Sequence, residues 1–544
     1  MIRRRLLSSF ASSNYRLPQT ISQLLAQHVE SPDVKGSQPA ATITVTGWIK
    51  SIRRQKNVSF AVLTDGSSPK GLQAVFIGAG KDSEEVKKLT NGSAVKLTGK
   101  LVLSPGKGQD KELVIEGSSN TPGCVELLGE CPHDTYPIQK QTLSNEYLRD
   151  YAHLRARTDR IASMIRLRSA LKRNISEWFE TQGFHQVHTP ILTGNDAEGA
   201  GEAFRIAPVQ GEHPAAIAAA SSSSATPNLT SPPTPTDFFS LPAYLTVSHQ
   251  LHLEALASAL SRVYSLSPCF RAEPSLTARH LAEFWMLEAE WAFSASGVEE
   301  ICMFVEAMLR SIVGGVLGLG GPHRSSVGED ISVLWKQNIN GGEDKLTSLK
   351  DAITSRTQWT RLSYAEVIKE LQNYHNSYTL GGNGIGSTSK SKSKVRFQFD
   401  PNYSKGLQSE HERWLAEHLI GGPVFITDYP LAIKPFYMRL NNHSSSAEKM
   451  GEETVACFDL LIPHIGELVG GSVREERLDG LRARMNQSGL GGPEYEWYRD
   501  LRRYGGAPHG GFGMGFERLV AWVGGIENVR ECVPVPRWPG RMLL

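Results

Sequence analysis

The sequence predicts an α+β protein in which a small β-barrel precedes a larger domain built on an antiparallel sheet. Two observations support this: short stretches of alternating apolar and polar residues fill positions 42–116, and from residue 159 helical and strand-like stretches mix without regular alternation. With 544 residues, 40% of them hydrophobic, the chain is long enough for two or three separate cores.

Charge and hydropathy restrict the partners that this chain is expected to have. The formal net charge is only +2, so a nucleic acid would be held by local basic patches rather than by a global field. The sequence contains no stretch of 18 apolar residues, which predicts neither a membrane span nor a membrane partner. The six cysteines form no C-x-x-C pair, which argues against a zinc ribbon.

Residues 1–29 have the composition of a mitochondrial transit peptide. This segment contains four arginines and repeated serines, and the first acidic residue is Glu30. On a helix, the apolar residues at positions 2, 6, 7 and 10 would lie opposite the arginines. We therefore predict an import peptide over residues 1–29 and a location in the mitochondrial matrix.

The first folded unit is predicted over residues 42–120. Five short stretches rich in Thr, Val and Ile are separated by Gly, Asp, Ser and Pro, which is typical of strands joined by turns. Five strands of this kind fit a small barrel of the OB type, a common platform for single-stranded nucleic acids. Residues 121–158 are interpreted as a linker.

The second unit is predicted over residues 159–544. A long amphipathic helix at its start ends at Gly183. Further helices are expected over 247–260 and 515–526, and strands over 262–273 and 283–293. Such a mixture favours an antiparallel sheet with helices on its faces. Two low-complexity insertions, 211–236 and 377–394, are expected to be surface segments without a functional role.

Three segments of the second unit are candidates for function. The first, from Gly183 to Pro190, reads as a helix stop followed by a strand, and it carries no chemistry. In the second, Arg271 and Glu273 on a strand would point to one face, where the arginine can neutralise a phosphate and the carboxylate can accept from an amine. His280 and Phe284 follow, and Phe284 could stack on a flat base.

The third segment is a glycine-rich stretch near the C-terminus. Its glycines, Gly511, Gly513 and Gly515, are interpreted as a loop whose backbone comes close to a ligand. A helix then begins, with Arg518 in its first turn. Taken singly, each of these segments is also compatible with a surface ion pair or an ordinary glycine turn.

Together and in this order, the three segments closely resemble the motifs of class II aminoacyl-tRNA synthetases, and the similarity runs from about residue 42 to the C-terminus. In that class the first motif forms the dimer interface, the second holds ATP and the amino acid, and the third supplies the arginine that clamps the γ-phosphate. A barrel before the catalytic domain is typical of the aspartate, asparagine and lysine subgroup, where it binds the anticodon. The resemblance therefore implies a homodimer with an antiparallel-sheet catalytic domain.

The resemblance also implies a role for particular residues. Catalytic roles fall to Arg271, Glu273 and Arg518. ATP binding is implied for Arg271, Glu273, His280, Phe284, Glu467, Gly515 and Arg518, with Glu467 and Asp459 as the carboxylates for Mg²⁺. Asparagine binding is implied for Glu198, Gln250, Glu288 and Arg474, and anticodon binding for Phe60 and Gln73.

The expected amino acid depends on two positions. Aspartate enzymes of this subgroup carry a lysine that pairs with the substrate carboxylate, and the matching residue here is Leu253. A substrate carboxylate that is buried without that lysine would lose several kcal/mol of binding free energy. Glu288 resembles the residue of asparagine enzymes that accepts from the carboxamide, and Arg474 would donate to the carboxamide oxygen. His249 departs from the small or Pro residue that is usual beside this pocket.

The resemblance thus implies a synthetase of the mitochondrial type that joins asparagine to tRNA(Asn), through an asparaginyl adenylate, for organellar translation. Three other interpretations remain open. An aspartate-specific synthetase is disfavoured by Leu253 and Glu288, and a paralogue that amidates aspartate without tRNA is disfavoured by the barrel. An RNA-binding protein with a decayed synthetase domain is disfavoured by the intact Arg271, Glu273, Glu467 and Arg518.

Overall fold

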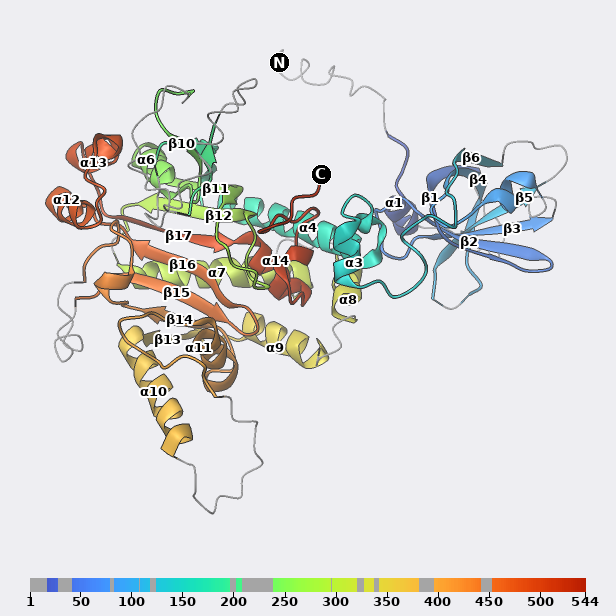
Figure 1. The fold of residues 1–544 in the computed structure, drawn as a ribbon. Coiled ribbons are helices and arrows are strands. Elements are labelled where there is room, and N and C mark those ends of the chain that lie inside the picture. Colours follow the sequence, from blue (N-terminus) through green and yellow to red (C-terminus); the bar gives the residue numbers. More distant parts are fainter. Residues whose placement is uncertain are drawn as a thin grey trace, which may run out of the picture. The chain divides into compact units, whose positions relative to one another are not determined.

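The structure is a computed structural model, and the chain divides into two compact units, residues 1–162 and 163–544 (Figure 1). It describes residues 17–27, 42–78, 83–106, 108–117, 124–195, 202–207, 238–294, 296–319, 327–336, 342–380, 396–441 and 453–544. None of the helices in these ranges has the length and apolar character needed to cross a membrane. The insertion at 211–236 lies outside the described residues, as does the part of the second insertion beyond Leu380.

The first unit contains the predicted barrel. Its strands are β1 (Thr42–Arg54), β2 (Val58–Thr64), β3 (Leu72–Gly78), β4 (Ala94–Leu103) and β5 (Lys111–Gly117). They are ordered β1-β2-β3-β5-β4, and β4 pairs back with β1, so the five strands close into a ring. The predicted OB-type barrel is therefore confirmed. A sixth strand, β6 (Val125–Gly129), pairs with β4 and lies within the segment interpreted as a linker.

A short helix completes the barrel core and lies inside the segment predicted as an import peptide. In α1 (Ile21–Ala26), Ile21 and Leu24 are buried among the core side chains of the barrel. The backbone N–H of Ile21 donates to Asp65 (2.8 Å), and Lys111 Nζ donates to the carbonyl of Leu24 (3.1 Å). A cation at a helix C-terminus satisfies carbonyls that have no partner within the helix. The predicted boundary at residue 29 therefore falls after a helix of the barrel core.

The second unit is built on an eight-stranded sheet, ordered β13-β14-β15-β16-β17-β12-β11-β7. The strands are β7 (His185–Gln186), β11 (Arg262–Phe270), β12 (Glu283–Ala292), β13 (Thr360–Ser363), β14 (Val424–Thr427), β15 (Cys457–Ile462), β16 (Gly466–Val473) and β17 (His509–Gly515). Only the pairs at the two ends, β11 with β7 and β13 with β14, are parallel. The predicted α+β class with an antiparallel sheet is confirmed.

Helices of the second unit contact this sheet. The longest are α4 (Asp159–Thr181), α6 (Gln250–Leu260), α7 (Val298–Leu317), α9 (Gly342–Thr354), α10 (Tyr364–Leu380) and α12 (Leu478–Gln487). Shorter ones in this unit include α8 (Gly328–Lys336), α11 (Ser409–Trp414), α13 (Glu496–Arg503) and α14 (Phe516–Gly524), whereas α2 (Glu84–Lys88) and α3 (Asn145–Asp150) belong to the first unit. As predicted, the long helix α4 is followed by Gly183, whose φ of +75° suits glycine.

A small three-stranded sheet is formed by β8 (Leu192–Thr193), β10 (Ala243–Leu245) and β9 (Arg205–Ile206). Along the sequence, β9 precedes the first insertion and β10 follows it. The helix α6 itself contacts β11 and β12. The strands that carry the candidate site residues are therefore held by α6 as well as by their neighbours in the sheet.

Candidate active site

The candidate site follows one row of side chains along β12. Phe284, Met286, Glu288 and Glu290 alternate with residues of the other face, so they point to one side of the sheet. The neighbouring strand β17 places Gly515 opposite Met286 and Gly513 opposite Glu288. Because these glycines have no side chains, the sheet face stays open in front of the row.

The glycine-rich segment is therefore a strand, and its interpretation as a loop was wrong. The reason is its pairing: Gly511 lies opposite Glu290 within the ladder between β12 and β17. A Cβ at Gly511 would come within 2.2 Å of the Ala289 carbonyl oxygen and 2.4 Å of the Glu290 carboxyl carbon. Glycine is required there by close packing within the sheet.

A cavity of about 140 Å³ opens at the Phe284 end of the row. Arg271 and Glu273 line it, and the guanidinium carbon of Arg271 lies 5.5 Å from the ring centre of Phe284. Both residues follow β11, which ends at Phe270, so their predicted place on a strand is corrected. They still face one cavity, with 3.8 Å between Arg271 Nη1 and Glu273 Oε1.

His280 is held on the same wall of the cavity. Its Nε2 lies 3.2 Å from Glu273 Oε2, and its Nδ1 lies 2.6 Å from Thr277 Oγ1. Burial lowers the pKa of His280 although Glu273 opposes this, so the imidazole is neutral at pH 7. The neutral His280 adds no full charge, and its one N–H, at Nε2, faces the Glu273 carboxylate in this structure.

The charged end of the cavity contains Arg518 and Glu467. Arg518, in the first turn of α14, donates from Nη1 to the Glu467 carbonyl (2.8 Å) and lies 3.5 Å from Glu467 Oε2. Burial alone would raise the pKa of Glu467, but Arg518 and Lys434 outweigh it and lower the pKa. The Glu467 carboxylate is thus an ionised oxygen ligand beside a fixed guanidinium.

Arg279 also lines this cavity, and the sequence reasoning missed it. Its Nη2 lies 2.9 Å from Glu412 Oε2, and its Nη1 donates to Ser409 Oγ (2.8 Å). Burial raises the pKa of Glu412, and Arg279 counteracts this increase. The only signal in the sequence was the position of Arg279 directly before His280.

Asp459, predicted as a metal ligand, already has a cation beside it. Lys434 Nζ donates to both of its carboxylate oxygens, at 3.0 and 2.8 Å. Burial would lower the pKa of Lys434, but Asp459 outweighs it and keeps that pKa above its usual value. The Lys434 ammonium also lies 3.9 Å from the ring centre of Tyr429. Lys434 was not a sequence candidate, because it is distant from the three motifs along the chain.

Glu288 and Arg474 lie further along the row from the cavity. The Glu288 carboxylate accepts from Ser248 Oγ (2.5 Å) and from the backbone N–H of His249 (3.0 Å), at the start of α6. Arg474 is 2% exposed and pairs with Glu290 and with the hydroxyl of Ser472. The predicted carboxylate and guanidinium are therefore both buried and held in place.

Leu253 provides no cation to this region. Its side chain is fully buried in a small apolar cluster with Ala257 and Val263. Gln250, one turn earlier on α6, donates from its side chain to Glu254 (3.0 Å). Glu198, the fourth residue predicted for asparagine, lies outside the described residues.

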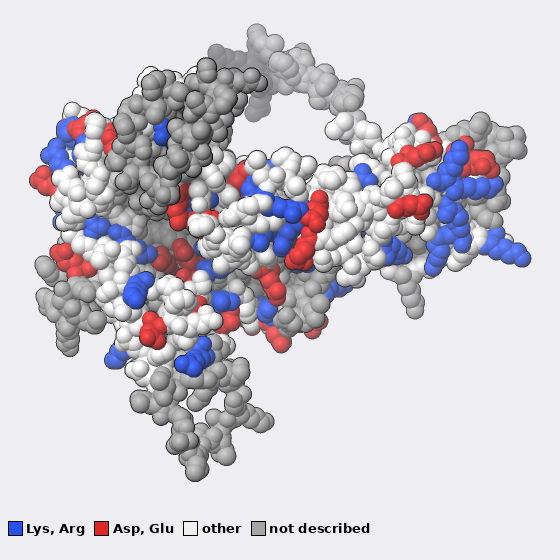
Figure 2. Space-filling model, viewed as in Figure 1, with Lys and Arg blue, Asp and Glu red and all other residues white. Residues whose placement is uncertain are grey.

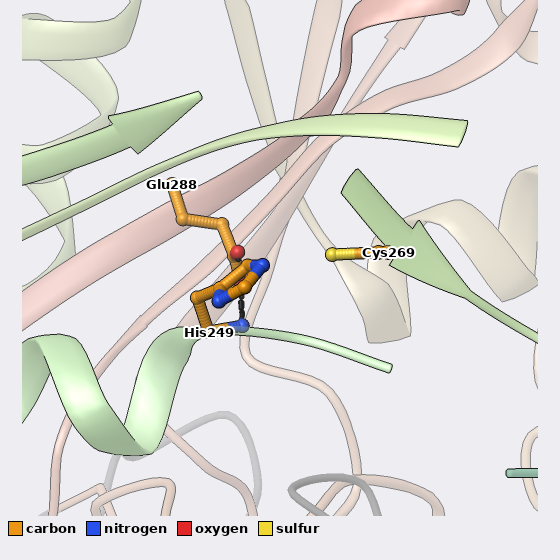
Figure 3. Close-up of side chains that lie close together, drawn as sticks. All are labelled: His249, Cys269 and Glu288. Carbon is orange, nitrogen blue, oxygen red and sulfur yellow. Dashed lines mark hydrogen bonds between the residues drawn. The ribbon is translucent and has the colours of Figure 1, made fainter. Parts of the chain in front are cut away.

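His249, Cys269 and Glu288 bring three potential metal-ligand atoms within 4.8 Å of one another (Figure 3). Hydrogen bonds already engage the histidine, since Nδ1 lies 2.6 Å from Thr189 Oγ1 and Nε2 lies 3.1 Å from the Pro268 carbonyl oxygen. A carbonyl can only accept, so Nε2 donates and Nδ1 accepts from the threonine. With its two nitrogens used in this way, the cluster is explained as a hydrogen-bonded core at the start of α6.

The barrel residues Phe60 and Gln73 lie on one outer face. Phe60 pairs with Val75 and Gln73 with Val62, so the two side chains are diagonal neighbours on β2 and β3. Both are partly exposed, and Arg53 lies over the Phe60 ring at 5.3 Å. Figure 2 shows many basic side chains over the barrel. Arg54 is engaged differently, because it donates to three carbonyls at the end of α2, including that of Leu89 (2.7 Å).

Comparison with known proteins identifies relatives of both units. Residues 144–539 match the family described as tRNA synthetases class II (D, K and N), and residues 43–117 match the OB-fold nucleic acid binding domain. The asparagine--tRNA ligase of Microcystis aeruginosa is 41% identical over 506 residues, covering 92% of this chain and 96% of its own length. That of Legionella pneumophila is 40% identical over 503 residues, covering 92% and 95%.

Solved structures of asparaginyl-tRNA synthetases are also similar to this chain. The asparaginyl-tRNA synthetase from Pyrococcus horikoshii, complexed with asparaginyl-adenylate, is similar with a TM-score of 0.72 and 29% identity, covering 95% of this chain and all of that one. The enzyme from Entamoeba histolytica, also complexed with asparaginyl-adenylate, is similar with a TM-score of 0.69 and 25% identity, covering 93% and 98%.

Proposed function

The chain belongs to the class II aminoacyl-tRNA synthetases for aspartate, lysine and asparagine, in the family of asparagine--tRNA ligases, and we propose that it joins asparagine to tRNA(Asn) with ATP. The observation that carries this proposal is the row on β12. Phe284 and Met286 line the nucleotide cavity, and Glu288 lies further along the same face, next in the row to Glu290, which pairs with the buried Arg474. The amino acid side chain and the ATP phosphates can therefore be held at the two ends of one row.

The activation step needs no general base, because the α-carboxylate of asparagine is already ionised. That carboxylate attacks the α-phosphorus of ATP, the bond to the bridging oxygen breaks, and pyrophosphate leaves. Arg271 neutralises the α-phosphate and Arg518 the leaving pyrophosphate, while Phe284 stacks on the adenine. The 3′-hydroxyl of the terminal adenosine of the tRNA then attacks the adenylate carbonyl, AMP leaves, and the hydroxyl proton passes to the phosphate of the leaving AMP.

Mg²⁺ fits this site best at Glu467. Its carboxylate is ionised, and hard oxygen ligands suit this cation. At Asp459, Lys434 already donates to both carboxylate oxygens, so a bound cation would share them with the ammonium. When bound, Mg²⁺ would neutralise charge on the ATP phosphates.

Selectivity for asparagine over aspartate is expected from the charges at the far end of the row. An aspartate carboxylate would meet the buried Glu288 side chain without a lysine at position 253, whereas a carboxamide can donate to Glu288 and accept from Arg474. A site with buried partners for both ends of an amide rejects the acid by roughly 10⁴-fold.

The test of the proposed function is ATP–pyrophosphate exchange by the full chain, with asparagine, aspartate and lysine offered separately. We expect exchange with asparagine only. Exchange with aspartate would keep the class II chemistry but overturn the roles given to Leu253 and Glu288. Activity with none of the three would favour the decayed-enzyme interpretation instead.

We also propose that the outer face of β2 and β3 binds the anticodon of the tRNA. Replacing Phe60 by alanine is expected to raise the KM for tRNA by about 5–150-fold, because stacking on one base is worth about 1–3 kcal/mol. Exchange without tRNA should not change. Phe60→Tyr retains the ring and serves as the control. Equal tRNA KM values for Phe60→Ala and the parent would place the anticodon elsewhere.

We further propose a role in the mitochondrial matrix and a homodimeric assembly. The similarity to a transit peptide supports a role in organellar translation in the mitochondrial matrix, provided that processing leaves Thr20 and α1 with the barrel. The exposed position of β7 supports the proposal of a homodimer. This strand is the outermost one of the sheet, and both of its residues are exposed.

A further inference from the structure

One buried carboxylate, Glu254 on α6, connects several parts of the second unit. Its side chain is fully buried and surrounded by donors. Oε2 accepts from Arg502 Nη2 (2.7 Å) and Tyr498 Oη (2.7 Å), and it lies 3.0 Å from His509 Nε2. These three partners come from α13 and β17, so the oxygen is fixed by elements far from α6 in the sequence.

The other oxygen of Glu254 faces the residues proposed to bind asparagine. Oε1 accepts from Gln250 Nε2 (3.0 Å) and lies 3.9 Å from Arg474 Nε. Glu254 and Glu290 thus flank the Arg474 guanidinium. A guanidinium that is held by carboxylates on two sides cannot rotate without leaving a buried charge unpaired.

The bond to Gln250 also determines which end of its amide is presented. Only the amide nitrogen can donate to a carboxylate, so the oxygen of Gln250 must point away from Glu254. An oxygen is the atom that the α-ammonium group of an amino acid requires. Without Glu254, this contact would no longer prevent the Gln250 amide from flipping. The flipped amide would present its NH₂ group, a donor, to the α-ammonium group of the amino acid.

Glu254 stays ionised in this environment. Burial would raise the pKa of Glu254, but Arg502 and His509, together with Arg474, hold it far below its usual value. Glu254 therefore carries a negative charge beside Arg474 and Arg502, whereas burial raises the pKa of Glu290 to about 7. Such a network, with its charges paired and hydrogen-bonded, can fix orientations in a buried region.

We infer that Glu254 is a positioning residue for asparagine, which orients Gln250 and Arg474 through one oxygen while α13 and β17 hold the other. This inference rests on the proposed function. The residue was not a candidate in the sequence, because its partners lie 4, 220, 244, 248 and 255 positions away along the chain.

The test compares two substitutions that each remove the charge of one buried acid. In Glu254→Gln, one amide oxygen cannot serve both sets of donors, so either Gln250 or Arg502 loses its acceptor. The matched control is Glu306→Gln, because Glu306 on α7 is likewise buried (7% exposed) and accepts from Arg310 (2.8 Å) and Arg361 (3.0 Å). We expect the KM for asparagine in pyrophosphate exchange to rise about tenfold or more in Glu254→Gln only. The KM for ATP should change less than twofold in both variants.

Calorimetric titration of each variant with asparagine provides a second readout, independent of turnover. Tyr498→Phe removes a single donor to Glu254 and covers the case in which Glu254→Gln does not fold. It should raise the KM and Kd for asparagine about threefold, again without an effect on ATP. Equal effects on ATP and asparagine, or the same asparagine defect in Glu306→Gln, would overturn the inference. Failure of the unaltered chain to activate asparagine would overturn the proposed function and this inference with it.

Discussion

Replacing Arg518 by alanine is expected to reduce asparagine-dependent pyrophosphate exchange by about 10³-fold or more, since an arginine that stabilises charge in phosphoryl transfer is worth about 10³–10⁵ in rate. Arg518 lies at the charged end of the cavity and is oriented by the Glu467 carbonyl. The loss should appear mainly in kcat, because the charge on the leaving pyrophosphate develops during the reaction.

The control for this prediction is Arg482→Ala, which removes a half-exposed arginine of α12 that does not line the cavity. Its exchange rate should match that of the parent. Arg518→Lys keeps the charge but loses the planar fork, so an intermediate rate is expected. Both alanine variants should unfold at the temperature of the parent. Near-normal exchange in Arg518→Ala would remove Arg518 from the ATP site.

Deleting residues 1–29 is expected to destabilise the barrel by roughly 3–6 kcal/mol, because the burial of Ile21 and Leu24 is lost at about 1.5–3 kcal/mol each. A loss of this size is comparable to the whole stability of a small domain. The catalytic unit has its own core, so pyrophosphate exchange should persist while aminoacylation of tRNA falls sharply. Thermal unfolding followed by circular dichroism and tRNA charging measure the two effects.

The matched deletion removes residues 1–19 and keeps Thr20, which caps α1 through a bond from the Gln23 N–H to its hydroxyl (3.3 Å). It should leave both barrel stability and tRNA charging intact. If the longer deletion proves insoluble, Leu24→Ala and the exposed Ser22→Ala form an equivalent pair. If the barrel unfolds at the same temperature after removal of residues 1–29, α1 does not contribute to the stability of its core.

The fold was largely predictable because its strands and long helices carry clear periodic patterns. The barrel strands, α4 and the two strands β11 and β12 were all expected from the sequence. Among the elements that the sequence reasoning did not identify, α1 and β6 have six and five residues, too few for a period to stand out. Strand β17 was misread because its alternating glycines look like a loop, whereas packing against Glu290 is what requires Gly511.

The candidate site was predictable where its residues cluster in the sequence. Arg271, Glu273, His280 and Phe284 lie within 14 consecutive positions and line one cavity. Arg279 lies in the same stretch but had no motif to single it out. Lys434 and Glu254 could not be found, because each acquires its role from partners brought together only by the sheet and its helices. Buried ion pairs between distant segments leave no local pattern.

The position of α1 at the start of the barrel affects the order of events during synthesis. Its partners Asp65 and Lys111 lie 44 and 87 residues further along the chain, so the helix is synthesised before they are. At about 5–20 residues per second, Lys111 is added roughly 4–17 s after Leu24. Until then Ile21 and Leu24 lack the complete set of strands that buries them. Completion of β5 ends this period, because the segment is then buried in the barrel.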